Sequence, residues 1–129
     1  MTRLALLAAG LLLGLGAGWL VWGPSGTEPE VNGTGTLARL PAGPVEVQAE
    51  TVRLGAGFRS RHVHGGPTFN LVRAGEVEIV EGDGRRRYRR GELFFEPAGR
   101  PHTIVVLEDA RLDVLRLLPP GAPATEEVG

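Results

Sequence analysis

Three histidines are the side chains in this sequence best suited to chemistry, and the 129-residue chain contains only these 3. His62 and His64 are two residues apart, so in an extended strand their side chains project from the same face. His102 follows the turn-forming run at residues 97–101 and therefore comes from a different strand. Imidazole is a common ligand of divalent transition metals, so three imidazoles converging from two strands predict a metal site.

The segments that carry these histidines are predicted to be short β-strands separated by turns. Apolar and polar residues alternate from Val45, with a bulge expected near Thr51 where the alternation changes phase. Gly82-Asp83-Gly84 has the composition of a tight hairpin loop. No amphipathic helix is visible after residue 24, so an all-β sandwich or barrel is expected. The expected strands are residues 45–54, 59–64, 68–73, 76–81, 85–90, 92–96, 102–107 and 111–118.

The composition suits one small domain and excludes several functions. The chain has 42% hydrophobic residues, enough for a single core. Its 14 basic and 15 acidic residues nearly cancel, which argues against a nucleic-acid-binding surface. Cysteine is absent, so there is no disulfide, thiolate ligand or cysteine nucleophile. The arginines at residues 85–90 flank the predicted hairpin and are expected to form a solvated face paired to Glu76, Glu78 and Glu81.

An uncharged apolar run extends from Leu4 to Trp22. At about 1.5 Å per residue a helix of this length spans the ~30 Å hydrocarbon layer of a membrane. Arg3 marks the cytoplasmic side, and Trp19 and Trp22 fall at the outer interface. A retained anchor gives a single-pass membrane protein with its C-terminal domain outside the cytoplasm. The alternative is a cleaved signal peptide and a secreted domain.

Composition divides the chain into four parts. Residues 1–23 are the membrane anchor or signal segment, and residues 24–44 form a flexible linker rich in glycine and proline. Residues 45–120 form the barrel. Residues 121–129 are expected to be a loose C-terminal tail.

The residues around the histidines resemble the two signature motifs of the cupin superfamily. The motif positions are Gly57, His62, His64, Thr68 and Gly75 in the first segment and Gly91, Pro97, Gly99 and His102 in the second. The short interval of residues 76–90 between them is like that of single-domain cupins. Two positions depart from the pattern. The position of the opening glycine in the first motif falls on Ala56, one residue before Gly57, and Val106 stands where the second motif closes with asparagine. The resemblance implies a double-stranded β-helix, or jelly-roll barrel.

The resemblance also implies a set of site residues. The metal-binding histidines of the family fall on His62, His64 and His102. In many cupins a glutamate supplies a fourth ligand, but that position falls on Thr68, whose hydroxyl is a poor ligand for a transition metal. Thr68 and Asn70 share a strand face with each other and are expected to contact a ligand. Glu96 is the nearest alternative carboxylate, although alternation does not tell which way it faces.

The sequence therefore predicts a membrane-tethered cupin domain that binds a divalent metal and a small anionic or chelating molecule. Iron, manganese, zinc, nickel and copper are not distinguished by three imidazoles. These neutral ligands leave the metal charge uncompensated, which favours an anion. Alternatives are a three-histidine dioxygenase and a metal-free structural or interaction barrel. A small-molecule ligand and the membrane are the expected partners, nucleic acid is not, and a homodimer stays open.

Overall fold

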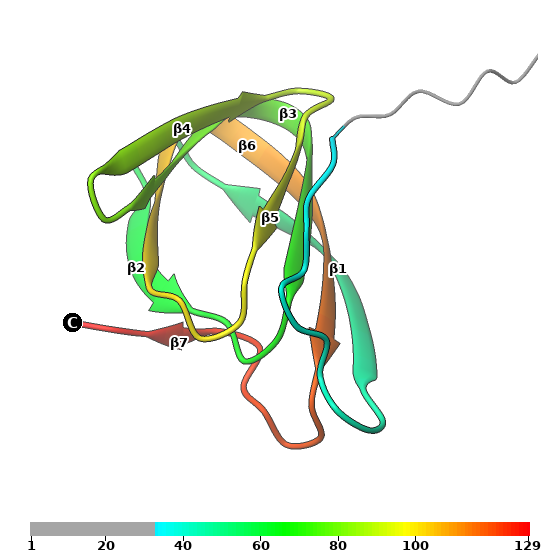
Figure 1. Cartoon of the computed structure of the whole chain (residues 1–129). Coiled ribbons are helices and arrows are strands. Elements are labelled where there is room, and N and C mark those ends of the chain that lie inside the picture. The colour runs from blue at the N-terminus through cyan, green and yellow to red at the C-terminus, as the bar shows by residue number, and fades with distance from the viewer. Residues whose placement is uncertain (1–32) are drawn as a thin grey trace, which may run out of the picture. The chain divides into compact units, whose positions relative to one another are not determined.

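The computed structural model describes residues 33–129 of the chain. These residues form seven β-strands and no helix, so the predicted all-β fold is confirmed (Figure 1). The strands are β1 (Glu46–Leu54), β2 (Arg59–Val63), β3 (Thr68–Glu81), β4 (Gly84–Arg89), β5 (Leu93–Glu96), β6 (His102–Leu118) and β7 (Glu126–Glu127). Residues 33–129 contain no helix long and apolar enough to cross a membrane. The expected span at residues 4–22 lies outside the described part of the chain.

Two long antiparallel strands, β3 and β6, form the centre of the barrel. They pair with each other from Thr68 opposite Arg116 to Val80 opposite Thr103. The first half of β3 also pairs with β5 and its second half with β4. In the same way, β6 pairs with β2 near its start and with β1 near its end. Both long strands therefore belong to both faces of the barrel, as Figure 1 shows.

The two long strands correct the prediction that residues 68–73 and 76–81, and likewise 102–107 and 111–118, form separate strands. Gly75 is the reason that the first pair stays joined. It has a φ of 78°, and a Cβ at this position would collide with the carbonyl oxygen of Asp109. Glycine thus lets β3 bend against β6, with register shifts between Val72 and Val77, instead of ending the strand.

The predicted bulge near Thr51 is absent, because β1 pairs with β6 in an unbroken register from Glu46 to Leu54. The change of phase in the sequence has another cause. Val47 faces outward and is 61% exposed, whereas Val52 and Leu54 pack against the core. Apolar residues therefore occur on both faces of β1, and in the sequence this looks like a change of phase in the alternation of apolar and polar residues.

The core lies between the two faces of the barrel. The buried cluster consists of Val72, Val77, Phe94, Ile104, Val106, Ala110, Leu112 and Val114. Tyr88 packs against this cluster and stacks on Phe94 with ring centroids 4.7 Å apart. This apolar packing fixes the strands that carry the histidines.

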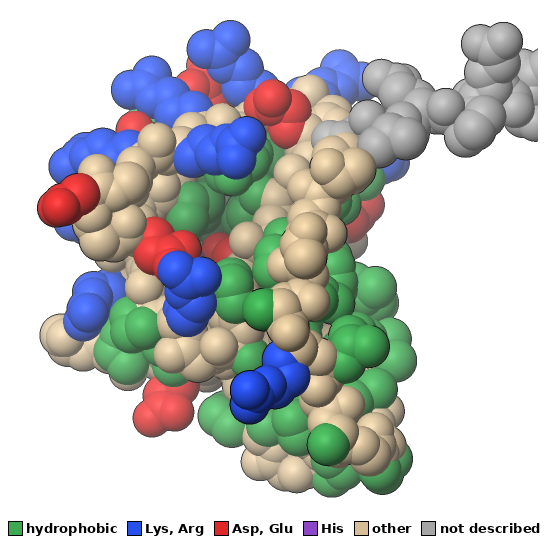
Figure 2. All heavy atoms as spheres, in the orientation of Figure 1, with side chains coloured by type: hydrophobic (Ala, Val, Ile, Leu, Met, Phe, Trp, Pro, Cys, Tyr) green, Lys and Arg blue, Asp and Glu red, His purple; other side chains and the backbone are tan. Residues whose placement is uncertain are grey.

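The hairpin between β3 and β4 carries the arginine-rich surface. Glu81 pairs with Gly84 across a two-residue turn, which confirms the predicted hairpin loop. Nε of Arg87 lies 3.3 Å from Oε2 of Glu78, and Nε of Arg89 lies 3.4 Å from Oε2 of Glu76. Figure 2 shows basic and acidic side chains intermixed over this end of the molecule. The surface is thus a paired, solvated face, as predicted, except that Glu81 pairs with Arg100.

The C-terminal tail differs from the expected loose segment. Residues 126–127 form β7, which pairs with β2 at His62 and Val63. The backbone N–H of Val128 also donates to the Arg61 carbonyl, at 3.0 Å. The edge of β2 offers unpaired backbone groups, and the tail satisfies them. The last residues of the chain are therefore part of the barrel wall.

Candidate metal centre

The structure brings the three histidines together at one end of the barrel. His62 lies on β2, and His64 follows directly after that strand. His102 is the first residue of β6 and pairs directly with His62. All three are buried, with exposed fractions of 8% or less. The pairing of β2 with β6 therefore supplies the convergence that the sequence predicted.

Glu96, the last residue of β5, completes this group. Its Oε2 atom lies 2.8 Å from Nε2 of His64, and its Oε1 atom lies 2.8 Å from Nε2 of His102. The Nε2 atoms of His62 and His102 are 3.0 Å apart. One ligand atom from each of the four residues lies within 4.8 Å of every other. The four buried side chains form a compact group that could hold a metal ion.

Each histidine is held from its far side by its Nδ1 atom. Nδ1 of His102 lies 3.0 Å from the carbonyl oxygen of Arg100, and Nδ1 of His64 lies 2.9 Å from that of Ala124. A carbonyl oxygen only accepts, so both Nδ1 atoms are donors. Nδ1 of His62 lies 3.2 Å from the Ser60 hydroxyl. Such contacts fix the ring orientation and direct the Nε2 lone pair toward a metal.

Glu96 stands directly opposite Thr68 in the pairing of β5 with β3. Directly opposed residues point to the same face, so Glu96 presents a carboxylate beside the position where many cupins carry their glutamate. Sequence reasoning noted Glu96 but could not orient it, because Leu93, Phe94 and Phe95 are all apolar and hide the alternation. The structure thus places a carboxylate on β5, the strand next to the one that carries Thr68.

Thr68 and Asn70, the two residues expected to contact a ligand, differ in whether they line the interior cavity. Thr68 is fully buried at 0% exposure, and its hydroxyl donates to the Gly66 carbonyl at 3.1 Å. It does not line the cavity described below, and its expected contact with a ligand stays a prediction. Asn70 does line that cavity, and its Nδ2 atom donates to Oε2 of Glu96 at 3.0 Å. Asn70 therefore holds the carboxylate in position.

Burial and close neighbours shift the proton affinities in this group. Burial and the neighbouring imidazoles lower the pKa of His62 to about 4, so its imidazole is neutral at neutral pH. Burial acts to lower the pKa of His102 as well, but the hydrogen bond and charge of Glu96 raise it above 6.5. For Glu96, burial favours the neutral form, yet the hydrogen bonds from His102 and His64 lower its pKa to about 2.

The donor set fits a divalent transition metal. Three imidazole nitrogens and one carboxylate oxygen are the ligand types that zinc, iron, manganese, nickel and copper share. The ionised Glu96 carboxylate would compensate part of the metal charge, which corrects the expectation of a wholly uncompensated centre. One positive charge remains on such a group when the imidazoles are neutral. A metal there would still attract an anion.

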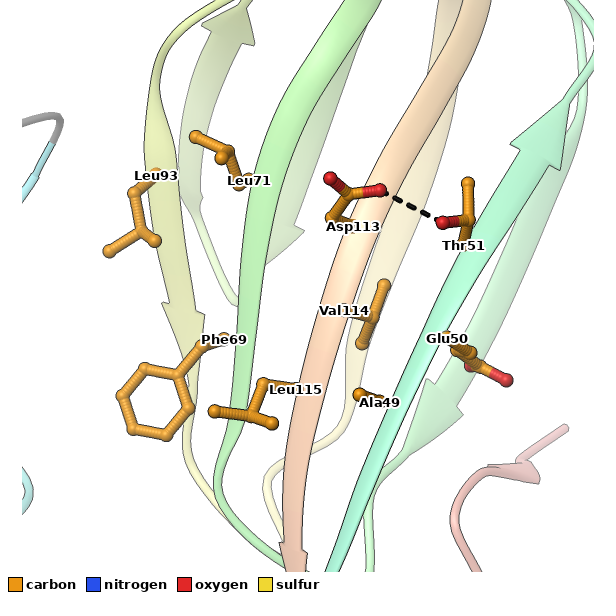
Figure 3. Close-up of a pocket in the computed structure, with 9 residues that line it drawn as sticks. All are labelled: Ala49, Glu50, Thr51, Phe69, Leu71, Leu93, Asp113, Val114 and Leu115. Carbon is orange, nitrogen blue, oxygen red and sulfur yellow. Dashed lines mark hydrogen bonds between the residues drawn. The ribbon is translucent and has the colours of Figure 1, made fainter.

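The group opens into a cavity of about 300 Å³ inside the barrel. His62, His64 and Glu96 line it at one end, and Phe94, Leu112 and Val114 are among its apolar walls. A larger hollow of about 720 Å³ lies on the outer face, where Figure 3 shows Phe69, Leu71, Leu93 and Leu115 around it. No histidine lines this outer groove. Of these two hollows, only the interior cavity is lined by candidate metal ligands.

Comparison with solved structures shows the same fold. A cupin superfamily protein from Desulfitobacterium hafniense matches with a TM-score of 0.55 and 21% identity, over 70% of this chain and 84% of that one. A conserved protein of unknown function from Streptococcus pyogenes matches with a TM-score of 0.53 and 23% identity, over 57% and 65% of the two chains. The DMSP lyase DddQ from Ruegeria pomeroyi matches with a TM-score of 0.54 and 26% identity, over 62% of this chain and 42% of that one.

The chain thus spans less than two thirds of the length of the Streptococcus and Ruegeria proteins. None of the curated proteins compared with it matches. The family model of the cupin domain, Cupin_2, matches residues 49–118, which include all three histidines and Glu96. With this match over more than half of its length, and with the barrel that its strands form, the chain belongs to the cupin domain family.

Proposed function

We propose that this protein is a metal-binding cupin that holds one divalent transition metal through His62, His64, His102 and Glu96. The observation that carries the proposal is the convergence of one ligand atom from each of the three histidines and from Glu96 within 4.8 Å of one another. The proposal extends to a small anionic ligand, because the buried group opens into a cavity and would carry one positive charge with the metal bound.

The hydrogen bonds of the metal-free group support this assignment. His102 donates from Nδ1 to a carbonyl, and its Nε2 atom is within hydrogen-bond distance of Glu96, so a proton there occupies the position of a metal. Nδ1 of His64 likewise lies 2.9 Å from a carbonyl oxygen, and its Nε2 atom lies 2.8 Å from Glu96. A metal would bind nitrogen and oxygen atoms that already point at one another.

The dioxygenase alternative is weakened by Glu96. That alternative depends on a ligand set of three histidines alone, whereas here a carboxylate lies 2.8 Å from two of the imidazoles. The proposal therefore stays with metal and ligand binding.

The first prediction concerns metal content. The full-length chain, purified in mild detergent, should contain about one transition metal per chain, and the His62→Ala/His64→Ala double variant should contain none. Elemental analysis measures both, and Arg59→Ala, an exposed position on the same strand, is the control. Added metal should also raise the melting temperature of the parent. A parent that stays metal-free and does not respond to divalent ions would favour the metal-free barrel.

The second prediction concerns the Glu96 carboxylate. Glu96→Thr should weaken metal binding by more than the roughly 10- to 100-fold typical of losing a supporting partner, because it removes a ligand. Thr68→Glu combined with Glu96→Thr should recover most of the affinity, since the two positions are directly opposed and face the same interior. Competition with a chromophoric chelator measures the affinity.

Glu46→Thr, an exposed carboxylate on β1, should change nothing in that assay. If Glu96→Thr binds metal as tightly as the parent, the carboxylate is not a ligand.

The third prediction concerns pH. Neutral imidazole is required for ligation, and the pKa of His102 is raised above its usual 6.5 by Glu96. As the pH is lowered, metal affinity should therefore begin to fall while the pH is still above 6.5, and should then drop by about tenfold for each further pH unit, as one proton competes for the site. His62 should add nothing until about pH 4. The same chelator competition between pH 5 and pH 8 checks this, and a flat profile in a folded protein would contradict it.

The fourth prediction concerns location. We propose that the barrel is displayed outside the cytoplasm, on the strength of the apolar run from Leu4 to Trp22 after Arg3. A C-terminal alkaline phosphatase fusion should be active, and a C-terminal fusion to a fluorescent protein that matures only in the cytoplasm should be dark. The reverse pattern would place the domain in the cytoplasm.

A further inference from the structure

The cavity beside the histidines also holds a buried arginine. Arg116 lies on β6, and its exposed fraction is 6%. It lines the same cavity as His62, His64 and Asn70. A guanidinium carries its charge at every physiological pH, and burying such a charge is costly unless it is paired and hydrogen-bonded. The partners of Arg116 therefore indicate what this position is for.

The guanidinium is only partly satisfied. Its Nη1 atom donates to Gln48 at 3.4 Å and forms a short contact with the Glu50 carboxylate. Within residues 33–129 its Nε atom is buried and has no hydrogen-bond partner. An unpartnered buried donor is uncommon, because it costs about 1–3 kcal/mol. Arginine binds a carboxylate best with two parallel N–H donors, and the edge that contains Nε is left without an acceptor.

Glu50 is a partner that can leave. Its side chain is 40% exposed, against 8% for Arg116. It lines both the interior cavity and the outer groove, and in Figure 3 its carboxylate points away from the apolar side chains of that groove. Glu50 can therefore move into solvent and keep its charge hydrated, while Arg116 stays buried and needs another anion.

The remaining walls of the cavity define what that anion carries. Phe94, Ile104 and Leu112 line it with apolar surface, which suits a hydrocarbon portion. A volume of about 300 Å³ limits the ligand to a small molecule. Glu127 also lines the cavity, but it is an exposed residue on β7 and accepts from Ser60 at 3.4 Å. The combination selects a small organic carboxylate with an apolar body.

We infer that Arg116 binds the carboxylate group of this ligand. Without the ligand, the Glu50 carboxylate pairs with the Arg116 guanidinium, and the ligand carboxylate displaces it. The inference rests on the proposed function only in placing the rest of the ligand toward the metal centre. Arg116 contacts neither the histidines nor Glu96 among its hydrogen bonds, so it is a binding residue and not a metal ligand.

The test uses benzoate as the probe and benzamide as its neutral counterpart, titrated calorimetrically into the full-length chain with and without bound zinc. Benzoate should bind and benzamide should bind much more weakly. Arg116→Gln should weaken benzoate binding by about 10- to 100-fold, because a charge-assisted pair of hydrogen bonds is lost. Glu50→Gln should instead tighten it by about tenfold, because the competing carboxylate is removed.

The two variants should change benzoate affinity in opposite directions if Arg116 anchors the ligand. If the pair of Arg116 and Glu50 were only structural, both variants would weaken benzoate binding. Arg73→Gln, an arginine that is 50% exposed, is the matched control and should bind benzoate like the parent. If Arg116→Gln does not fold, Glu50→Gln alone decides the matter. Unchanged or weaker benzoate binding in Glu50→Gln would overturn the inference.

The outcome also distinguishes this inference from the proposed function. Metal content should be unchanged in Arg116→Gln and in Glu50→Gln. A chain that binds no metal but shows Arg116-dependent benzoate binding would leave the anchor standing and remove the metal centre. A chain that binds zinc, yet binds benzoate equally well with or without Arg116, would leave the metal centre standing and remove the Arg116 anchor.

Discussion

The buried carboxylate of Glu96 imposes a condition that the whole site meets. An ionised carboxylate inside a protein is stable only where several donors face it. Here two imidazoles lie 2.8 Å from its oxygens, and the Asn70 amide donates to it at 3.0 Å. Those imidazoles are in turn fixed by backbone carbonyls on their far sides. Four strands and the C-terminal tail thus contribute to holding one negative charge, and the same arrangement would give a metal its ligands.

The barrel makes this arrangement through its two long strands. Because β3 and β6 pass through both faces, they bring β5, which carries Glu96, and β2, which carries His62, to opposite sides of one interior. The bend at Gly75 keeps β3 continuous where it crosses β6 closely. The tail adds β7 to the edge of β2 and supplies the Ala124 carbonyl that orients an imidazole. Stability and site geometry therefore depend on the same backbone pairings.

The cavity is lined by both polar and apolar side chains. His62, His64 and Glu96 of the candidate metal centre line it, and so does Arg116, whose Nε atom has no acceptor within residues 33–129. A ligand with an anionic group and an apolar body fits such a lining because each part meets its complement. The outer groove of Figure 3 has apolar side chains but no such convergence of donors.

The sequence by itself determined the shared face of His62 and His64, because side chains in a strand repeat every two residues. It also determined the family, through the spacing of its histidines, glycines and prolines. The tertiary structure decided which carboxylate joins the histidines, since Glu96 follows three apolar residues that conceal the phase of β5. It also decided the roles of Arg116 and the tail. Their contacts join residues more than fifty positions apart, and only the pairing of strands brings such residues together.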